Sequence, residues 1–266
     1  MAAIATVTAI YPVQRKMIDI HTHVVYGVDD GARSLEMSMQ MLRNAVEGGI
    51  TGICCTAHAR PGHRLFPAQD YLERLELLQR FLWQEGLDLC LYSGCEIMYT
   101  SEAIQSLRGG FLPTLGGKGA VLVEFMPEIP WGMMQHAVRE MSNAGFHVLV
   151  AHVERYECLR EAFTWLEELK EMGCFLQRNA ETVLRSHGLM GDRWARKALK
   201  TGLIDVVASD MHNLTSRKGN LPEARAMLKR DYGEETALRL TEDTPRRILE
   251  GSLWEERRKG RSANGW

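Results

Sequence analysis

The sequence lacks the features that would indicate a secreted, membrane-spanning or nucleic-acid-binding protein. Its six cysteines include no C-x-x-C pair and mostly lie in apolar runs, as expected of buried thiols in a reducing compartment. No segment approaches eighteen consecutive apolar residues, so we predict no membrane insertion. The net charge of −2 and the isoelectric point near 6.5 give no reason to expect a nucleic-acid partner. We expect a cytoplasmic protein, and the sequence predicts no particular oligomeric state.

Length and composition favour one large domain. A chain of 266 residues with 45% hydrophobic content can form a single full core. Residues 1–16 carry no basic leader and no small-residue cleavage site, so we interpret them as a loosely ordered N-terminal extension. Residues 17–254 form the expected domain, and residues 255–266 form a polar, basic C-terminal tail.

Predicted strands and helices alternate along the whole domain. After the opening strand at residues 17–20, strands are predicted at 50–56, 87–95, 120–125, 146–151, 173–177 and 205–208. Helices are predicted at 35–47, with Ser34 as N-cap, and at 69–84, 101–107, 131–144, 159–172, 180–185, 192–201 and 221–251. This alternation is typical of an α/β protein with a parallel sheet. Seven strands suggest a closed or nearly closed barrel; an open doubly wound sheet is disfavoured because no Gly-rich phosphate loop follows the first strand.

The opening strand ends in a histidine pair. Residues two apart on a strand point to the same face, so His21 and His23 should present two imidazoles side by side. The acidic pair Asp29 and Asp30 follows shortly, closed by Gly31. Two nitrogen ligands and a carboxylate suit a divalent metal, although an H-x-H pair alone is equally compatible with two polar surface residues.

Further donors follow at or near the ends of the later strands. Parallel strands place their C-terminal ends on one face of a barrel, where such folds carry their chemistry. The donors in these positions are His21, His23, His58, Glu96, Glu124, His152, Asp210 and His212. With one acid of the Asp29–Asp30 pair, the set contains five imidazoles and four carboxylates, which is too many for one ion. We therefore predict a cluster of two or three divalent ions.

The donor types constrain the metal and the reaction. Mixed nitrogen and oxygen ligation without thiolate favours manganese, iron or zinc. Clustered ions lower the pKa of a shared water, supply it as a bridging hydroxide nucleophile, and stabilise both oxygens of an in-line displacement. Their surplus positive charge suits a phosphate dianion. These properties predict a phosphomonoesterase.

Several motifs, in order, resemble the polymerase-and-histidinol-phosphatase (PHP) superfamily. They are H-T-H after M-I-D-I, D-D-G, T-A-H, G-C-E-I, V-E-F, A-H-V-E-R-Y and S-D-M-H-N. The last two are most similar to the manganese-dependent protein-tyrosine phosphatases of bacterial capsule and exopolysaccharide operons. The resemblance implies a distorted (β/α)7 barrel of the PHP type and a trinuclear site. It also implies a substrate, the phosphotyrosine tail of a membrane-associated bacterial tyrosine kinase that regulates polysaccharide export.

The same resemblance assigns roles by position. The implied metal ligands are His21, His23, Asp30, His58, Glu96, Glu124, His152, Asp210 and His212, with Asp30 preferred to Asp29 and with Glu96 and Glu124 as bridging carboxylates. Arg155 and Arg217 match arginines that contact the phosphate, although each is almost as compatible with a surface ion pair. The loop after His58 departs from the relatives: it reads A-R-P-G, where Arg60 is the candidate for a substrate contact.

The sequence also permits three other interpretations. Cys54 to Arg60 fits the C-x5-R loop of thiolate phosphatases, but the segment contains no glycine to wrap around a phosphate. A phosphatase of the same type could act on a small phosphomonoester such as histidinol phosphate. A non-catalytic, metal-binding regulator of the kinase is disfavoured because every metal position is present.

Overall fold

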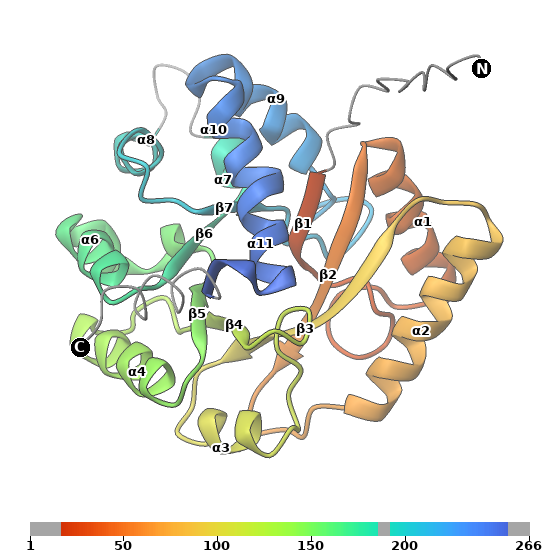
Figure 1. The fold of residues 1–266 in the computed structure, drawn as a ribbon, viewed down its shortest axis with the longest axis horizontal. Helices are drawn as coiled ribbons and strands as arrows, with labels where there is room; N and C mark the ends of the chain where they lie inside the picture. The colour runs from red at the N-terminus through yellow and green to blue at the C-terminus, as the bar shows by residue number, and fades with distance from the viewer. Residues whose placement is uncertain (1–16, 186–191, 255–266) are drawn as a thin grey trace, which may run out of the picture.

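A single parallel sheet of seven strands forms the centre of the molecule (Figure 1). The computed structural model describes residues 17–185 and 192–254, so the expected N-terminal extension and C-terminal tail lie outside the described residues. The strands pair in sequence order, each parallel to the next. They are β1 (Met17–Thr22), β2 (Ile50–Ala59), β3 (Cys90–Met98), β4 (Ala120–Glu124), β5 (His147–Val150), β6 (Phe175–Asn179) and β7 (Val206–Ala208).

Hydrogen bonds join β1 to the segment that follows β7. The amide of Asp210 donates to the carbonyl of His21, and the amide of His23 donates to the carbonyl of Met211, both at 2.9 Å. The side chain of Asp19 also accepts from the amide of Ser209 at 2.9 Å. These bonds bring the first and last strands together, so the sheet is nearly closed into a barrel. The predicted α/β barrel is confirmed.

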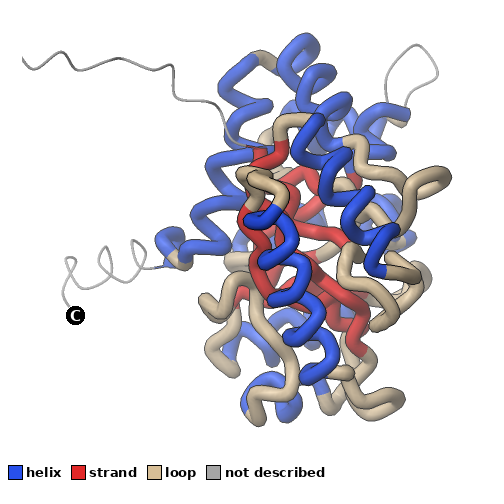
Figure 2. Tube along the Cα trace, turned by 90° about the vertical axis from the view of Figure 1, so that its right-hand side faces the viewer, coloured by secondary structure: helices blue, strands red, loops and turns tan. Residues whose placement is uncertain are grey.

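Helices surround the strands and separate them from solvent (Figure 2). The α-helices are α1 (Leu35–Glu47), α2 (Ala68–Gln84), α3 (Ala103–Arg108), α4 (Trp131–Asn143), α5 (Glu157–Glu161), α6 (Thr164–Glu171), α7 (Ala180–Arg185), α8 (Arg193–Lys200), α9 (Leu221–Tyr232), α10 (Glu234–Leu238) and α11 (Thr244–Glu250). A 3-10 turn (Val153–Arg155) and a π-helical turn (Arg239–Asp243) complete the described elements. The predicted N-cap of α1 is present, because the side chain of Ser34 accepts from the amide of Met37. Within the described residues, no helix is both long and apolar enough to cross a bilayer.

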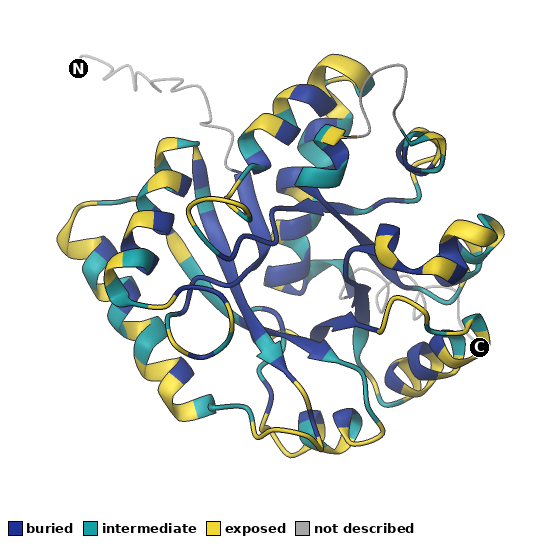
Figure 3. Cartoon of the chain, turned by 180° about the vertical axis from the view of Figure 1, so that it is seen from behind, coloured by how far each residue is buried: buried dark blue, intermediate teal, exposed yellow. Residues whose placement is uncertain are grey.

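The buried core has two parts, and the strands are dark blue along most of their length in Figure 3. The larger part lies between the sheet and the surrounding helices. The smaller part fills the barrel with side chains from the strands, from α11 and from the residues after α11, including Ile18, Ile20, Leu122, Leu149, Phe175, Val206, Ile248 and Trp254. Trp254 stacks on His147, at the start of β5, with ring centroids 4.3 Å apart. The N-terminal end of the barrel is therefore filled by apolar side chains, which leaves the C-terminal end for chemistry.

Several element ends differ from the prediction by two or three residues, and three differences change the architecture. β2 and β3 both end three residues later than predicted, so that His58 lies opposite Glu96 within the paired strands and not beyond their ends. The helix predicted at 159–172 is divided into α5 and α6 by extended backbone at Ala162. The helix predicted at 221–251 is interrupted at Gly233, whose φ of 90° suits a residue without a side chain.

Candidate metal centre

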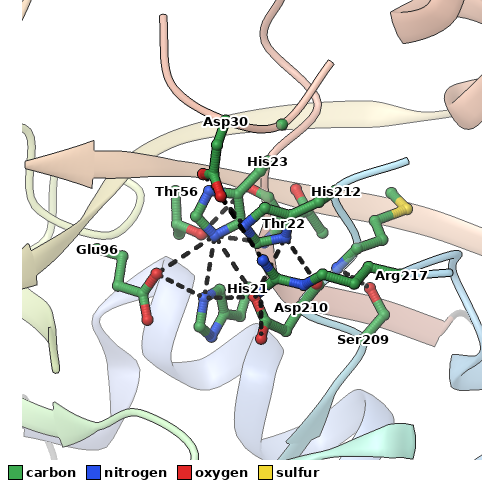
Figure 4. Close-up of polar contacts among 12 residues, drawn as sticks. His21, Thr22, His23, Asp30, Thr56, Glu96, Ser209, Asp210, His212 and Arg217 are labelled. Atoms are coloured by element: carbon green, nitrogen blue, oxygen red, sulfur yellow. Dashed lines mark hydrogen bonds and ion pairs between the residues drawn. The ribbon is translucent and has the colours of Figure 1, made fainter.

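All nine predicted ligands meet at the C-terminal end of the barrel, and Figure 4 shows most of them pointing toward one another. Three groups of donor atoms form, each with its atoms within 4.8 Å of one another. The groups are His23–Asp30–His58–His212, His21–His23–Glu96–Asp210 and His58–Glu96–Glu124. His152 adjoins them, because its Nε2 lies 2.8 Å from Glu96 Oε1.

The three groups of donor atoms share residues. His23 belongs to two of them, as do His58 and Glu96. A carboxylate has two oxygens and can serve two neighbouring ions, so Glu96 has the chemistry of a bridging ligand. Glu124 belongs to one group only. Overlapping sets of hard oxygen and imidazole donors suit a cluster of divalent cations and not a single ion.

Two buried ring nitrogens of the site, Nε2 of His212 and Nδ1 of His152, make no hydrogen bond within the described residues. Nε2 of His212 neither donates nor accepts a hydrogen bond, although the residue is only 1% exposed. The other ring nitrogen, Nδ1, lies 2.9 Å from the carbonyl oxygen of Asp210, which fixes the ring orientation. A buried, oriented imidazole nitrogen without a hydrogen bond is costly unless a ligand satisfies it. The donor set therefore fits divalent metal.

Charges within the site perturb one another strongly. Burial lowers the pKa of His23, but hydrogen bonds to Asp29 and Glu96 outweigh it and raise that pKa to about 10. Burial opposes ionisation of Glu96, yet His21 and His152 hold its pKa well below the usual range. Burial and the charge of His23 lower the pKa of His212 to about 3. In the metal-free protein His23 is thus a cation that neutralises part of the carboxylate charge.

The two acids of the D-D-G loop have different surroundings. Asp29 Oδ2 lies 2.7 Å from His23 Nδ1 and accepts the backbone amide of His58, while Oδ1 accepts the amide of Gly31. The Asp30 side chain is 65% exposed, and its Oδ1 lies 3.4 Å from His58 Nε2 and 3.5 Å from His212 Nε2. Asp30 therefore faces the donor groups, whereas Asp29 orients His23 from behind. This arrangement agrees with the preference for Asp30 as the ligand.

Two polar residues of β6 also support the site, and neither was predicted. Gln177 Oε1 accepts the backbone amide of His152 and lies 3.2 Å from His21 Nδ1. Asn179 donates its side-chain amide to Asp210 Oδ2 at 2.8 Å. The sequence offered one indication: the sixth predicted strand was the only predicted strand without a metal ligand at its end. Its polar residues Gln177 and Asn179 hold ligands that other strands supply.

Two proposed ligands have a left-handed backbone. His152 has φ 30° and Asp210 has φ 56°, and they are the only non-glycine residues with positive φ in the described part of the chain. Such conformations are uncommon for residues with side chains and concentrate at functional sites. At both positions the strand ends and the chain turns, which directs the side chain into the centre.

The two predicted arginines lie beside the centre and share one partner. Arg155 Nη2 donates to Asp210 Oδ2 at 2.7 Å, and Arg217 Nη2 lies 3.0 Å from both carboxylate oxygens of Asp210. Arg217 Nη1 also lies 3.8 Å from Asp30 Oδ2. Both side chains are partly exposed, at 42% and 34%. They contact carboxylates of the centre and also face the solvent from which a substrate would arrive.

The thiolate interpretation of Cys54 to Arg60 is wrong. Cys54 is fully buried inside the barrel, and burial raises the pKa of its thiol far above the ordinary value. β2 continues through this segment to Ala59, so no loop wraps around a phosphate. A buried neutral thiol on a strand is not a nucleophile.

Comparison with known proteins identifies the family of this site. The family model for capsular polysaccharide synthesis, CpsB/CapC, matches residues 17–250. The chain is 32% identical to the tyrosine-protein phosphatase CpsB of Streptococcus pneumoniae over 243 residues, covering 89% of this chain and 100% of the relative. It is 30% identical to the tyrosine-protein phosphatase YwqE of Bacillus subtilis over 227 residues, covering 85% of this chain and 89% of that relative.

Solved structures give the same result. A structure from a study of YwqE and CpsB, described there as metal-dependent tyrosine phosphatases, matches with a TM-score of 0.79 at 28% identity, covering 88% of this chain and 95% of that one. The phosphotriesterase homology protein of Escherichia coli shares the fold alone, with a TM-score of 0.54 at 10% identity over 89% of this chain and 99% of that one. The family model, the relatives and the fold agree: the chain belongs to the CpsB/CapC family of capsular polysaccharide synthesis proteins.

Proposed function

We propose that this protein hydrolyses phosphotyrosine on a bacterial tyrosine kinase that regulates capsular or exopolysaccharide synthesis. One observation carries the proposal: the nine side chains predicted as metal ligands converge at the open end of the barrel with two arginines beside them. The relatives with this fold are named tyrosine-protein phosphatases, which supports the same reaction here. The proposed partner is the phosphotyrosine tail of a membrane-associated kinase, and the proposed location is the cytoplasm.

Two or three divalent ions, most suitably Mn²⁺ with Fe or Zn as alternatives, would be held by the nine residues. They are His21, His23, Asp30, His58, Glu96, Glu124, His152, Asp210 and His212. Such ions supply Lewis acidity and an activated water for phosphoester hydrolysis. Asp29, Gln177 and Asn179 keep the ligand side chains oriented through the hydrogen bonds described above.

Arg155 and Arg217 would bind the phosphate oxygens. A guanidinium can offer two parallel N–H donors to phosphate and offset the charge that develops in the transition state. Both groups are already restrained by Asp210, so little side-chain freedom is lost when a substrate binds. The tyrosine ring would lie toward solvent, because the opposite end of the barrel is filled by apolar side chains.

The experiment compares kcat/KM on a phosphotyrosine peptide and on histidinol phosphate, using purified protein after chelation and reloading with Mn²⁺. We expect metal-dependent turnover with a preference for the peptide. Preference for histidinol phosphate would replace the proposed substrate with a small phosphomonoester. Binding of the kinase tail without turnover of any phosphoester would make the protein a regulator instead of an enzyme.

A further inference from the structure

A cavity of about 470 Å³ opens directly beside the metal centre. Asp29, Asp30 and His58 line one side of it, so the cavity is continuous with the proposed reaction site. The other side is formed by Val28 and by the segment that links β2 to α2, with Arg60, His63, Arg64, Leu65, Phe66 and Pro67. A group placed in this cavity would lie next to whatever occupies the centre. The cavity is not needed to hold the metal ions.

Positive charge dominates the part of this cavity outside the centre. Arg60 and Arg64 are exposed, and among the described residues neither guanidinium makes an ion pair or a side-chain hydrogen bond. By contrast, Arg155 and Arg217 are held by Asp210. The acid Glu102 lies near His63. A hydrogen bond from Ser101 lowers the pKa of Glu102, and the charge of His63 lowers it further. Arg60 and Arg64 are therefore the cations that an anion entering this cavity would meet.

The segment carrying these arginines has a defined structure. Arg60 and Arg64 form an antiparallel bridge, and the amide of Arg64 donates to the carbonyl of Arg60 at 3.0 Å. Between them, the hydroxyl of Thr100 donates to the carbonyl of Pro61 at 2.9 Å. Directly paired residues of an antiparallel bridge present their side chains on the same side. Both guanidiniums are thus presented together, which suits one bound group.

An apolar wall continues from the arginines. Leu65 is 93% exposed, the most exposed of the large hydrophobic residues in the described chain. Phe66 and Pro67 are half-buried and line the same cavity. Apolar and cationic side chains that share one hollow suit a polypeptide, whose aliphatic or aromatic groups need contacts beside its charged ones. A small inorganic anion would leave this wall unused.

We propose that this cavity binds an anionic side chain that flanks the phosphotyrosine in the polypeptide substrate, with Arg60 and Arg64 as its ligands. The inference rests on the proposed function, because it assumes that a phosphotyrosine occupies the adjacent centre. The recognised chemistry is an anion on the same chain, supplied either by Asp or Glu or by a second phosphotyrosine. Arg60 and Arg64 would then be residues that determine specificity and not catalytic residues.

The test measures KM and kcat of the Mn²⁺-loaded protein on four phosphotyrosine peptides that differ only in their flanks. The flanking residues are Ala, Glu, Lys or a non-hydrolysable phosphonate analogue of phosphotyrosine. Free phosphotyrosine, which has no flanks, serves as the reference substrate. The variants are R60E/R64E and, as a control charge reversal at a single exposed position of α2 away from this cavity, R80E.

For the wild-type protein we expect a KM about fivefold lower for anionic flanks than for Ala, with a smaller difference in high salt. R60E/R64E should lose this preference or reverse it toward Lys, its KM should change less for free phosphotyrosine than for the anionic peptides, and R80E should behave as wild type. A stronger effect of Glu or of the phosphonate decides which anion is the natural one. Equal flank preferences in wild type and R60E/R64E would overturn the inference while leaving the proposed function intact. Failure to turn over free phosphotyrosine and every peptide would overturn both.

Discussion

At the scale of single residues, the centre separates side chains that would bind metal from those that hold them in place. Glu96 contacts four histidines of the site, His21, His23, His58 and His152, at distances between 2.8 and 3.3 Å. Arg155 touches the centre only through Asp210. Substitutions at these two positions should therefore have different consequences, although both residues lie at the same end of the barrel.

We expect Glu96→Ala to lose metal and activity together, because it removes a carboxylate shared by two donor groups. Arg155→Ala should keep its metal and lower kcat about 100-fold, the usual effect of removing one donor to the transition state. Metal content of the purified variants, measured beside kcat, checks both outcomes. Arg139→Ala, at an exposed position of α4, is the control. Full metal occupancy in Glu96→Ala would contradict the ligand assignment.

The raised pKa of His23 has a consequence for the metal-free protein. A histidine whose pKa rises to about 10 on folding contributes stability that is complete below about pH 6.5, its unfolded pKa. That contribution is lost as the pH rises through 10. We therefore expect the free energy of unfolding of the metal-free protein to fall between pH 7 and 10, as measured with urea, and less so in His23→Gln.

Metal binding should displace the same proton, because only a neutral imidazole is a ligand. Titration of the metal-free protein with Mn²⁺ at pH 8 in two buffers of different ionisation enthalpy measures the protons released. We expect at least one. A heat that is independent of the buffer would show that His23 is already neutral and that its hydrogen bonds to Asp29 and Glu96 do not hold a proton.

At the scale of elements, the loop between β1 and α1 is built around its backbone. The amide of Ala32 donates to the carbonyl of His23, and the amide of Gly27 donates to the carbonyl of Ala32. A Cβ at Gly31 would lie 2.2 Å from the oxygen of His23, so no other residue fits without movement. This close approach keeps Asp29 and Asp30 over the centre.

Gly31→Ala should displace this loop, lower stability by about 1–3 kcal/mol and weaken metal binding about tenfold or more. Gly132→Ala is the matched control, because a Cβ there meets nothing within 4 Å and α4 gains a better helix former. Chemical denaturation and metal titration of both variants provide the comparison. Unchanged metal affinity in Gly31→Ala would show that the loop does not hold a ligand.

The sequence allowed most of this architecture to be predicted, because parallel strands bring their C-terminal ends together. That rule was enough to gather His58, Glu124 and His152 from distant segments. The rule does not predict which acid of the D-D-G loop faces the metal donors, because only the folded backbone places Asp29 behind His23. It also missed Gln177 and Asn179, because polar residues that orient ligands carry no spacing pattern. The break at Gly233 coincides with a positive φ, which the helical spacing of the flanking apolar residues does not reveal.

At the scale of the whole molecule, the metal centre connects parts of the chain that are far apart in sequence. His21 lies in β1 and His23 directly follows it, while Asp210 and His212 follow β7. Ions bound by these residues would add to the few hydrogen bonds that join the first and last strands. The stability of the barrel should therefore depend on its metal.

We expect chelation to lower the melting temperature of the protein by about 10 °C. Ions present at 1,000 times their dissociation constant stabilise the folded state by about 4 kcal/mol, and 1 kcal/mol shifts a domain of this size by about 2–4 °C. Calorimetry with and without EDTA measures the shift, and readdition of Mn²⁺ should reverse it. Glu96→Ala should melt at the same temperature in both conditions. Equal melting of the wild-type protein with and without chelator would show that the ions do not link the two ends of the barrel.

The contact between β1 and the segment after β7 also bears on synthesis at the ribosome. Asp19 and Ser209 are separated by 190 positions, so the barrel can close only after nearly the whole domain has emerged. A nascent chain that stops before Asp210 would carry the H-T-H motif without the partners that complete its donor group. The complete donor group would thus arise in one step, late in translation, and shortened products of the gene would lack it.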